Sequence, residues 1–128
     1  MADLLLDSDV VIWHLRGRSS VVERVLALAR SGRLGLSAIT RAEVLLGMRE
    51  PERKATLDFL NACQTLSVDA TVAEQGAEIL RSFRANGVTI SLPDALIGAT
   101  ALGREIPLYT CNPRHYPMPG LDLRSVAA

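Results

Sequence analysis

Three short apolar runs in this chain each lead to an acidic residue near the start of an expected helix. The runs and their acids are residues 4–6 with Asp7, residues 34–36 with Glu43, and residues 88–92 with Asp94. If the first two runs are parallel strands, Asp7 and Glu43 lie beyond the carboxyl ends of those strands, at one edge of a sheet. A helix that begins over the same edge brings Asp94 to it. The pattern therefore predicts a group of carboxylates at one edge of an α/β sheet.

Strand-like runs alternate with segments of helical periodicity along the whole chain. We expect strands at residues 4–6, 34–36, 65–68 and 106–110, with a fifth at the edge near residues 121–123. We expect helices at about residues 10–15, 20–30, 40–49, 51–62, 70–85 and 94–102. This alternation is typical of an α/β domain whose central parallel sheet of four to five strands is flanked by helices. At 128 residues, the chain is expected to form a single domain over residues 1–128.

The composition gives no global support for nucleic-acid binding. Arg and Lys total 14 and Asp and Glu total 14, so the formal net charge is zero. A basic stripe is the usual footprint of a nucleic-acid interface, and none is visible in the sequence. No apolar run is long enough to span a membrane, and the N-terminus lacks the basic segment of a secretory signal, so we expect a cytoplasmic protein. Cys63 and Cys111 are not spaced as a metal-binding pair and are expected to be reduced.

A group of three carboxylates needs a source of positive charge. Crowded carboxylates repel one another, and the burial of an isolated charge is costly. A bound divalent cation removes both penalties, and carboxylate oxygens suit Mg²⁺ or Mn²⁺. Such an ion lowers the pKa of a bound water and holds a phosphate oxygen. The pattern therefore favours metal-dependent hydrolysis of a phosphodiester.

Each acid also has a purely structural explanation. Asp7 can cap the helix that follows it, where a carboxylate is favourable. Residues 40–43 fit a capping box, in which Glu43 bonds to the Thr40 backbone N–H, and residues 91–94 are a looser version of the same signature. Capping does not require three acids that follow strand-like runs at one edge. The trio therefore points to chemistry more strongly than any one of the acids.

Four segments of the chain combine an apolar stretch with a polar signature. They are LLLDSDVVI at residues 4–12, TRAEVLLG at residues 40–47, LPDALIGATAL at residues 92–102 and LYTCNPRHY at residues 108–116. In this order, they resemble the motifs of PIN domains, and in particular those of the VapC-type ribonuclease toxins of bacterial VapBC toxin–antitoxin modules. Each motif is weak alone, but four in order along the whole chain are fairly specific.

The resemblance implies an endoribonuclease that depends on Mg²⁺ or Mn²⁺ and is built on one PIN-like domain. Asp7, Glu43 and Asp94 would be its catalytic, metal-binding carboxylates. Ser8 would support them by hydrogen bonding, and Asn112 would occupy a fourth catalytic position that is often acidic. The implied reaction is in-line attack of a metal-activated water on the phosphodiester, which leaves a 5′-phosphate and a 3′-hydroxyl without a covalent intermediate.

The chain departs from the family pattern near the first and last motifs. Asp9 stands where the family usually has Asn, so the chain carries an extra negative charge beside the site. Asp9 would support the three main acids. Asn112 and His115 are both neutral where at least one carboxylate is common, so Asn112 could hold a metal-bound water. Arg41 and Arg114 lie next to the motifs and could contact RNA phosphates, or they could be ordinary surface arginines.

The resemblance also implies protein partners. Family toxins usually form homodimers and are silenced by a cognate antitoxin, which lays a helix in a groove and reaches the acidic site. The apolar residues that could line such a groove are Val44, Leu45, Met48, Leu57 and Leu60. The same side chains could equally belong to the ordinary core.

Two other functions fit parts of the sequence. Residues 4–9 also fit the opening of a HAD-like phosphatase, in which Asp7 is the nucleophile and Asp9 the acid. That family needs a lysine near the phosphate, and Lys54, the one lysine of the chain, lies in a charged stretch. The second alternative is a catalytically inactive PIN-like domain that only binds a partner, because the fourth position is neutral.

Overall fold

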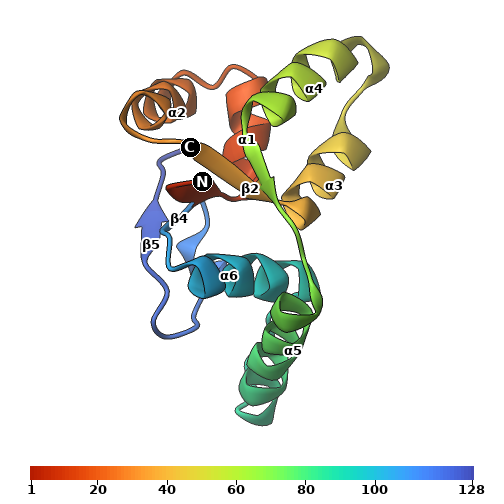
Figure 1. Ribbon diagram of the computed structural model, residues 1–128, viewed down its shortest axis with the longest axis vertical. Helices are drawn as coiled ribbons and strands as arrows, with labels where there is room; N and C mark the ends of the chain where they lie inside the picture. Colours follow the sequence, from red (N-terminus) through yellow and green to blue (C-terminus); the bar gives the residue numbers. More distant parts are fainter.

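Five parallel strands form one sheet in the computed structural model, which describes residues 1–128 (Figure 1). The strands are β1 Leu4–Leu6, β2 Leu34–Ser37, β3 Gln64–Leu66, β4 Leu108–Thr110 and β5 Leu123–Ser125. Their order across the sheet is β3-β2-β1-β4-β5, and every neighbouring pair is parallel. The expected parallel sheet is confirmed, with β1 at its centre. Because all strands point the same way, their carboxyl ends meet at one edge.

Six α-helices cover the two faces of this sheet. They are α1 Ser8–Leu15, α2 Ser19–Ser31, α3 Ala38–Gly47, α4 Arg53–Ala62, α5 Ala70–Ala85 and α6 Leu92–Arg104, with 3₁₀ turns η1 Glu50–Glu52 and η2 Pro113–His115. Figure 1 shows α5 and α6 on one side of the sheet and α1 to α4 on the other. Because side chains alternate along a strand, Leu4 and Leu6 face the core beneath α1 to α4, whereas Leu5 faces the core beneath α5 and α6.

Helix α3 begins two residues before its expected start. Its cap is Ser37, whose hydroxyl oxygen accepts a hydrogen bond from the Ile39 backbone N–H at 3.0 Å. Thr40 therefore lies inside the helix with a fully buried side chain, and the capping box expected over residues 40–43 is wrong. The Glu43 carboxylate is consequently available for another contact.

The apolar run at residues 88–92 does not form a strand. None of the five strands of the sheet pairs with it, and Ile90 is the one buried residue of the run. The chain is irregular up to Ser91, whose hydroxyl oxygen accepts the Asp94 backbone N–H at 3.2 Å and caps α6. Asp94 thus reaches the sheet edge from the start of a helix rather than from the end of a strand.

None of the helices combines the length and the apolar character that crossing a membrane requires. Cys63 is buried and Cys111 is half-buried, and both are free thiols.

Candidate active site

Asp7 lies at the carboxyl end of the central strand β1, where α1 begins. Its side chain is buried, and its two oxygens have different partners. Oδ1 accepts the Ser8 backbone N–H at 2.7 Å, and Oδ2 accepts the Thr110 hydroxyl at 2.8 Å. The first bond is the expected helix cap, and the second joins β1 to the end of β4. Capping is therefore right for Asp7, but it accounts for only one of its oxygens.

The surroundings of Asp7 disfavour its negative charge. Burial, and secondarily the neighbouring carboxylate of Asp9, raise the pKa of the Asp7 carboxyl to about 6, although the bond from Thr110 opposes this rise. No Lys or Arg side chain forms an ion pair with any acid at this edge of the sheet. The negative charge is thus not balanced by the chain itself, which is the situation that a bound cation relieves.

Glu43 has an exposed side chain on α3 and is tied to the sheet edge by Ser8. The Ser8 hydroxyl donates a hydrogen bond to Glu43 Oε1 at 2.6 Å, and its oxygen also lies 3.1 Å from the hydroxyl oxygen of Thr40. Because Ser8 directly follows Asp7, this bond brings the Glu43 carboxylate to the region of Asp7.

Asp94 reaches the same region from the first turn of α6. Its Oδ1 accepts a hydrogen bond from the Tyr116 hydroxyl at 3.3 Å, and its Oδ2 lies 3.6 Å from Nδ1 of His115. The Asp94 side chain makes no bond back to the helix cap at Ser91, so only half of the looser capping signature is present. The segment after β4 holds this carboxylate instead.

Tyr116 is a site residue that the sequence did not single out. Its side chain is 3% exposed. Burial first, and then the charges of Asp7 and Asp94, raise the pKa of the Tyr116 phenol above its usual value, so the hydroxyl stays protonated and remains a donor. The residue closes the fourth motif, but its position beside both carboxylates depends on how η2 packs against α6. No local pattern in the sequence reveals that packing.

Asp9 holds the segment that follows β4. Its carboxylate accepts the Cys111 backbone N–H at 3.2 Å and the Asn112 side-chain amide at 3.1 Å, and Thr110 Oγ1 lies 3.4 Å away. The extra charge at this position is therefore matched by several donors. Asn112 lies at the sheet edge, where its amide nitrogen faces Asp9 and its amide oxygen makes no hydrogen bond within the chain.

No hydrogen bond joins the three main acids directly. Ser8 contacts Asp7 through its backbone N–H and Glu43 through its hydroxyl, and the Tyr116 hydroxyl stands beside Asp7 and Asp94. No group of three or more His, Cys, Asp or Glu side chains is already arranged to hold a metal ion. The residues nevertheless fit Mg²⁺ or Mn²⁺, because they offer hard carboxylate oxygens and because Asp7 is desolvated without a cationic partner.

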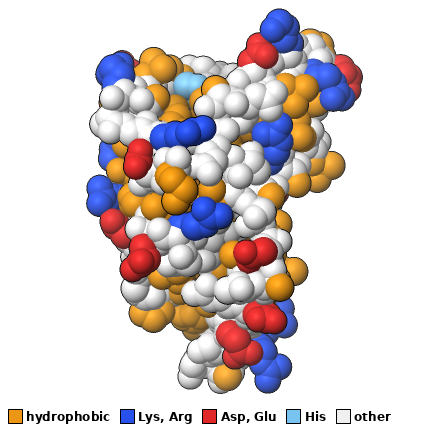
Figure 2. Space-filling view, in the orientation of Figure 1, with side chains coloured by type: hydrophobic (Ala, Val, Ile, Leu, Met, Phe, Trp, Pro, Cys, Tyr) orange, Lys and Arg blue, Asp and Glu red, His pale blue; other side chains and the backbone are white.

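The two arginines considered for RNA binding differ in their surroundings. Arg41 is half-buried and donates to Thr65 Oγ1 at 3.2 Å and to Asn61 Oδ1 at 2.7 Å, so it joins α3 to β3 and α4. Arg114 lies in η2, is exposed, and makes no ion pair or side-chain hydrogen bond. On the face shown in Figure 2, basic and acidic side chains are interspersed and form no continuous basic stripe.

A groove with apolar walls lies between α1, α3 and α4. Its apolar lining includes Ile12, Leu15, Val44, Met48 and Pro51. Of the five residues expected to line such a groove, Val44 and Met48 do so. Leu60 is fully buried in the core, and Leu45 and Leu57 lie outside the lining. Helical periodicity marks the apolar side of a helix, but it does not separate the part that faces the core from the part that faces the groove.

Comparison with known proteins identifies the family. The family described as PIN domain matches residues 4–121. The curated protein "Ribonuclease VapC10" of Mycobacterium tuberculosis is 33% identical over 115 residues, which cover 90% of this chain and 86% of that protein. "Ribonuclease VapC19" of the same organism is also 33% identical, over 89% of this chain and 92% of that protein.

Solved structures share the fold at lower sequence identity. A chain in the structure of DNA-bound VapBC from Salmonella typhimurium has a TM-score of 0.84 at 24% identity, over 98% of both chains. A chain in VapBC2 from Rickettsia felis has a TM-score of 0.83 at 22% identity, over 96% of this chain and 98% of that chain. The chain therefore belongs to the PIN-domain family, as a relative of the VapC ribonucleases.

Proposed function

We propose that this chain is a metal-dependent endoribonuclease and the toxin of a type II toxin–antitoxin module. The observation that carries the proposal is the buried carboxylate of Asp7, which has no basic partner. Glu43 is bonded to Ser8, the next residue in the chain, and Asp94 is bonded to Tyr116, whose hydroxyl also stands beside Asp7. Relatives with 33% identity are named ribonucleases. The site and the relatives together support hydrolysis of RNA phosphodiester bonds.

Asp7, Glu43 and Asp94 are the residues that would hold Mg²⁺ or Mn²⁺. When bound, the cation supplies a Lewis acid that polarises a phosphate oxygen and lowers the pKa of water. The chain contributes three carboxylates on elements that the sheet fixes, namely the end of β1, the side of α3 and the start of α6. Ser8 orients Glu43 through its bond of 2.6 Å, because hydrogen bonds to ligand side chains keep those ligands in place.

Asn112 is proposed as the fourth catalytic position, and Asp9 as its support. The Asp9 carboxylate accepts a hydrogen bond from the Asn112 amide N–H. The amide oxygen of Asn112 is therefore free to accept a hydrogen bond from water. A neutral amide can orient a water molecule without adding charge to a site that already holds several carboxylates. This role explains how the position can serve the reaction without being acidic.

Arg114 is better placed than Arg41 to contact an RNA phosphate. Its guanidinium is exposed and unpaired, whereas the donors of Arg41 are occupied by Thr65 and Asn61. In the proposed reaction, water attacks the phosphodiester in line with the leaving oxygen, and the products carry a 5′-phosphate and a 3′-hydroxyl. The cytoplasm is the proposed compartment, because it contains the RNA substrate.

An antitoxin is the proposed protein partner, with a helix in the groove between α1, α3 and α4. Structures that share this fold are titled VapBC or toxin–antitoxin complexes. Leu15, Val44 and Met48 line the groove together with Arg16 and Glu52, and this mixture suits an amphipathic helix. Association of two copies of the chain is proposed as well, by resemblance to the family.

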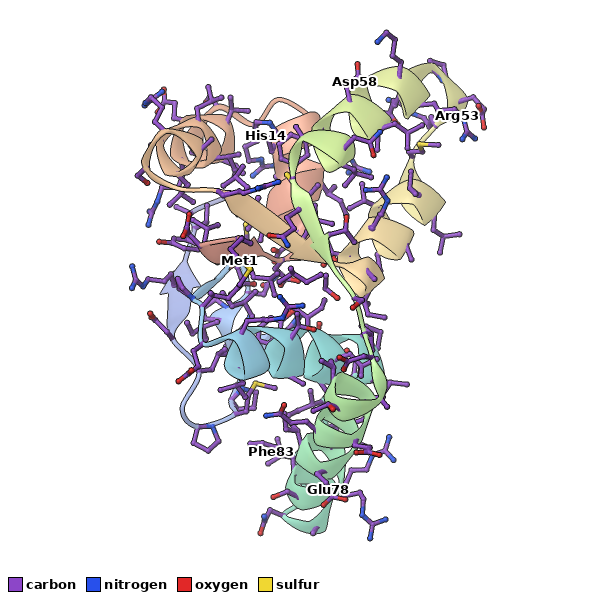
Figure 3. The ribbon with its side chains drawn as sticks, in the orientation of Figure 1. Met1, His14, Arg53, Asp58, Glu78 and Phe83 are labelled. Atoms are coloured by element: carbon purple, nitrogen blue, oxygen red, sulfur yellow. The ribbon has the colours of Figure 1, made fainter.

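Cleavage of RNA by the purified, antitoxin-free chain tests this function. Wild type, Asp94→Asn and Asp58→Asn are incubated with RNA of mixed sequence in Mg²⁺, in Mn²⁺ and in EDTA. Asp58 is a matched control, because Figure 3 shows it on the outer side of α4 and its one ion pair is with the exposed Lys54. We expect metal-dependent cleavage by the wild type and the control, and a rate lower by about 100-fold or more for Asp94→Asn.

Other outcomes would identify the alternatives. Cleavage that persists in EDTA, or equal rates in wild type and Asp94→Asn, would contradict the proposal. Metal binding without turnover on any RNA would favour an inactive partner-binding domain. A phosphoryl group trapped on Asp7 would favour a phosphatase, although Lys54 lies exposed on α4 and is paired with Asp58.

A further inference from the structure

Tyr116 carries a buried hydroxyl that core packing alone does not require. Its side chain is 3% exposed and belongs to the core cluster beneath α6. The ring lies against Gly98, where an added Cβ would sit 3.7 Å from ring carbon Cδ1. A phenylalanine ring would fill the same space. Because burying a hydroxyl costs free energy unless it is hydrogen-bonded, the oxygen at this position needs its own explanation.

The hydroxyl points along α6 to the candidate site. Gly98 lies one turn after Asp94 on the same side of the helix, so the ring packs beside Gly98 while the hydroxyl reaches Asp94 Oδ1 at 3.3 Å. His115 Nδ1 stands 3.6 Å from the other oxygen of the same carboxylate. Both oxygens of Asp94 are thus approached by consecutive residues from the end of η2.

Asp94 needs such a contact more than the other two acids do. Asp7 is held by the Ser8 backbone N–H and the Thr110 hydroxyl in addition to the nearby Tyr116 hydroxyl, and Glu43 is held by Ser8. Asp94 lies in the first turn of a helix that no strand directly precedes, and no arginine or lysine pairs with it. Without Tyr116, its side chain would keep one contact, at 3.6 Å, with the exposed His115.

We propose that Tyr116 is a positioning residue of the metal site, whose hydroxyl holds the Asp94 carboxylate in one orientation beside Asp7. The inference rests on the proposed function, since it concerns the same site. Hydrogen bonds of this kind orient metal ligands, and their loss typically weakens metal affinity or activity by roughly 10- to 100-fold.

Two variants that each lose one buried hydroxyl provide the test. Tyr116→Phe removes the hydroxyl that contacts Asp94 and stands beside Asp7. Tyr109→Phe is the matched control, because Tyr109 is 5% exposed, lies in the other core, and has its hydroxyl 3.4 Å from Arg124 Nη1. Mn²⁺ is titrated into the full chain and both variants, with free Mn²⁺ followed by EPR and folding followed by thermal unfolding.

We expect the Kd for Mn²⁺ to rise about tenfold or more in Tyr116→Phe and to stay within about twofold in Tyr109→Phe. Both variants should unfold cooperatively. With RNA at saturating Mn²⁺, kcat should fall in Tyr116→Phe while KM for RNA stays unchanged, because the hydroxyl acts on a metal ligand and not on the substrate.

Four results would contradict the inference or the function on which it rests. Wild-type Mn²⁺ affinity in Tyr116→Phe would show that the hydroxyl positions nothing. Equal loss of Mn²⁺ affinity in both variants, in step with lower unfolding temperatures, would assign the Tyr116 hydroxyl a structural role only. Loss of cooperative unfolding in Tyr116→Phe would lead to the same conclusion. Failure of the wild type itself to bind Mn²⁺ would overturn the proposed metal-dependent function, and that failure is visible before any variant is compared.

Discussion

The Ser8 hydroxyl donates a hydrogen bond of 2.6 Å to Oε1 of Glu43, a residue 35 positions further along the chain. The bond joins the first turn of α1 to α3 at the carboxyl edge of the sheet. The Glu43 side chain is otherwise exposed and is not used in helix capping. Ser8 is therefore the contact that keeps this carboxylate in the region of Asp7.

Replacement of Ser8 by alanine is expected to impair the site more than the fold. The lost hydrogen bond is only partly buried, so the free energy of unfolding should fall by about 1 kcal/mol. Metal affinity and RNA cleavage should fall by roughly tenfold, because Glu43 loses its orienting donor. Ser8→Thr, which keeps the hydroxyl, is the control and should remain close to wild type. Wild-type cleavage by Ser8→Ala would contradict the supporting role of this residue.

Removal of the Asp7 charge is expected to stabilise the metal-free protein at neutral pH. The pKa of Asp7 is raised by folding from 3.8 to about 6, so the folded state favours the protonated form. The contribution of Asp7 to stability is therefore fully present below its unfolded pKa and is lost as the pH rises through about 6. A pKa rise of this size lowers the free energy of unfolding above pH 7 by about 3 kcal/mol, relative to its value below pH 4.

Urea denaturation of wild type and Asp7→Asn in EDTA checks the sign of this effect. At pH 7.5, we expect Asp7→Asn to be more stable by about 1–3 kcal/mol, because asparagine carries no charge but keeps only part of the hydrogen bonding. At pH 4, the difference should vanish or reverse. A variant that is less stable than the wild type at both pH values would show that the hydrogen bonds of Asp7 outweigh its burial.

The sheet and the position of Asp7 could be predicted because both depend on local sequence. A run of three leucines is long enough for a strand buried on both faces, and the acid that ends it must then lie at the carboxyl edge. The run at residues 88–92 includes Thr89 and Ser91 and forms no strand, and Ile90 is its one buried residue. Whether such a short, mixed run joins a sheet depends on tertiary packing that the sequence does not display.

The contacts that hold the acids could not be predicted. The capping box over residues 40–43 was locally plausible, but the earlier cap at Ser37 displaced it and left Glu43 free to meet Ser8. Tyr116 reaches Asp94 only because η2 folds back against α6. Both contacts join segments distant in the chain, so no pattern of spacing reveals them.

Asp9 is expected to be important for stability as well as for the site. Its carboxylate accepts the Cys111 backbone N–H and the Asn112 amide. Asp9→Ala leaves both donors without this acceptor and should lower the free energy of unfolding by about 2–3 kcal/mol. Asp9→Asn restores the residue usual in the family and keeps one acceptor oxygen. Its free energy of unfolding should therefore fall by less than that of Asp9→Ala. Denaturant unfolding of the two variants tests this order, and equal stability of Asp9→Ala and wild type would contradict it.

Arg41 and Arg114 are expected to affect different properties. Arg41→Ala removes hydrogen bonds to Thr65 and Asn61 and should lower the free energy of unfolding by about 1–2 kcal/mol. Arg114→Ala should leave stability within about 0.5 kcal/mol of wild type, while KM for RNA rises and depends less on salt concentration. Parallel unfolding and cleavage measurements separate the two effects. An unchanged KM in Arg114→Ala would exclude its contact with RNA.

Mn²⁺ binding tests most directly whether Asp7, Glu43 and Asp94 form one metal site, and it requires no knowledge of the RNA target. Free Mn²⁺ is followed by EPR as the ion is added to antitoxin-free wild type, to Asp94→Asn and to the control Asp58→Asn. We expect binding by the wild type and the control, and loss of that binding in Asp94→Asn. Unchanged binding in Asp94→Asn would remove this residue from the site, and no binding by the wild type, even with RNA present, would contradict metal-dependent catalysis by this chain.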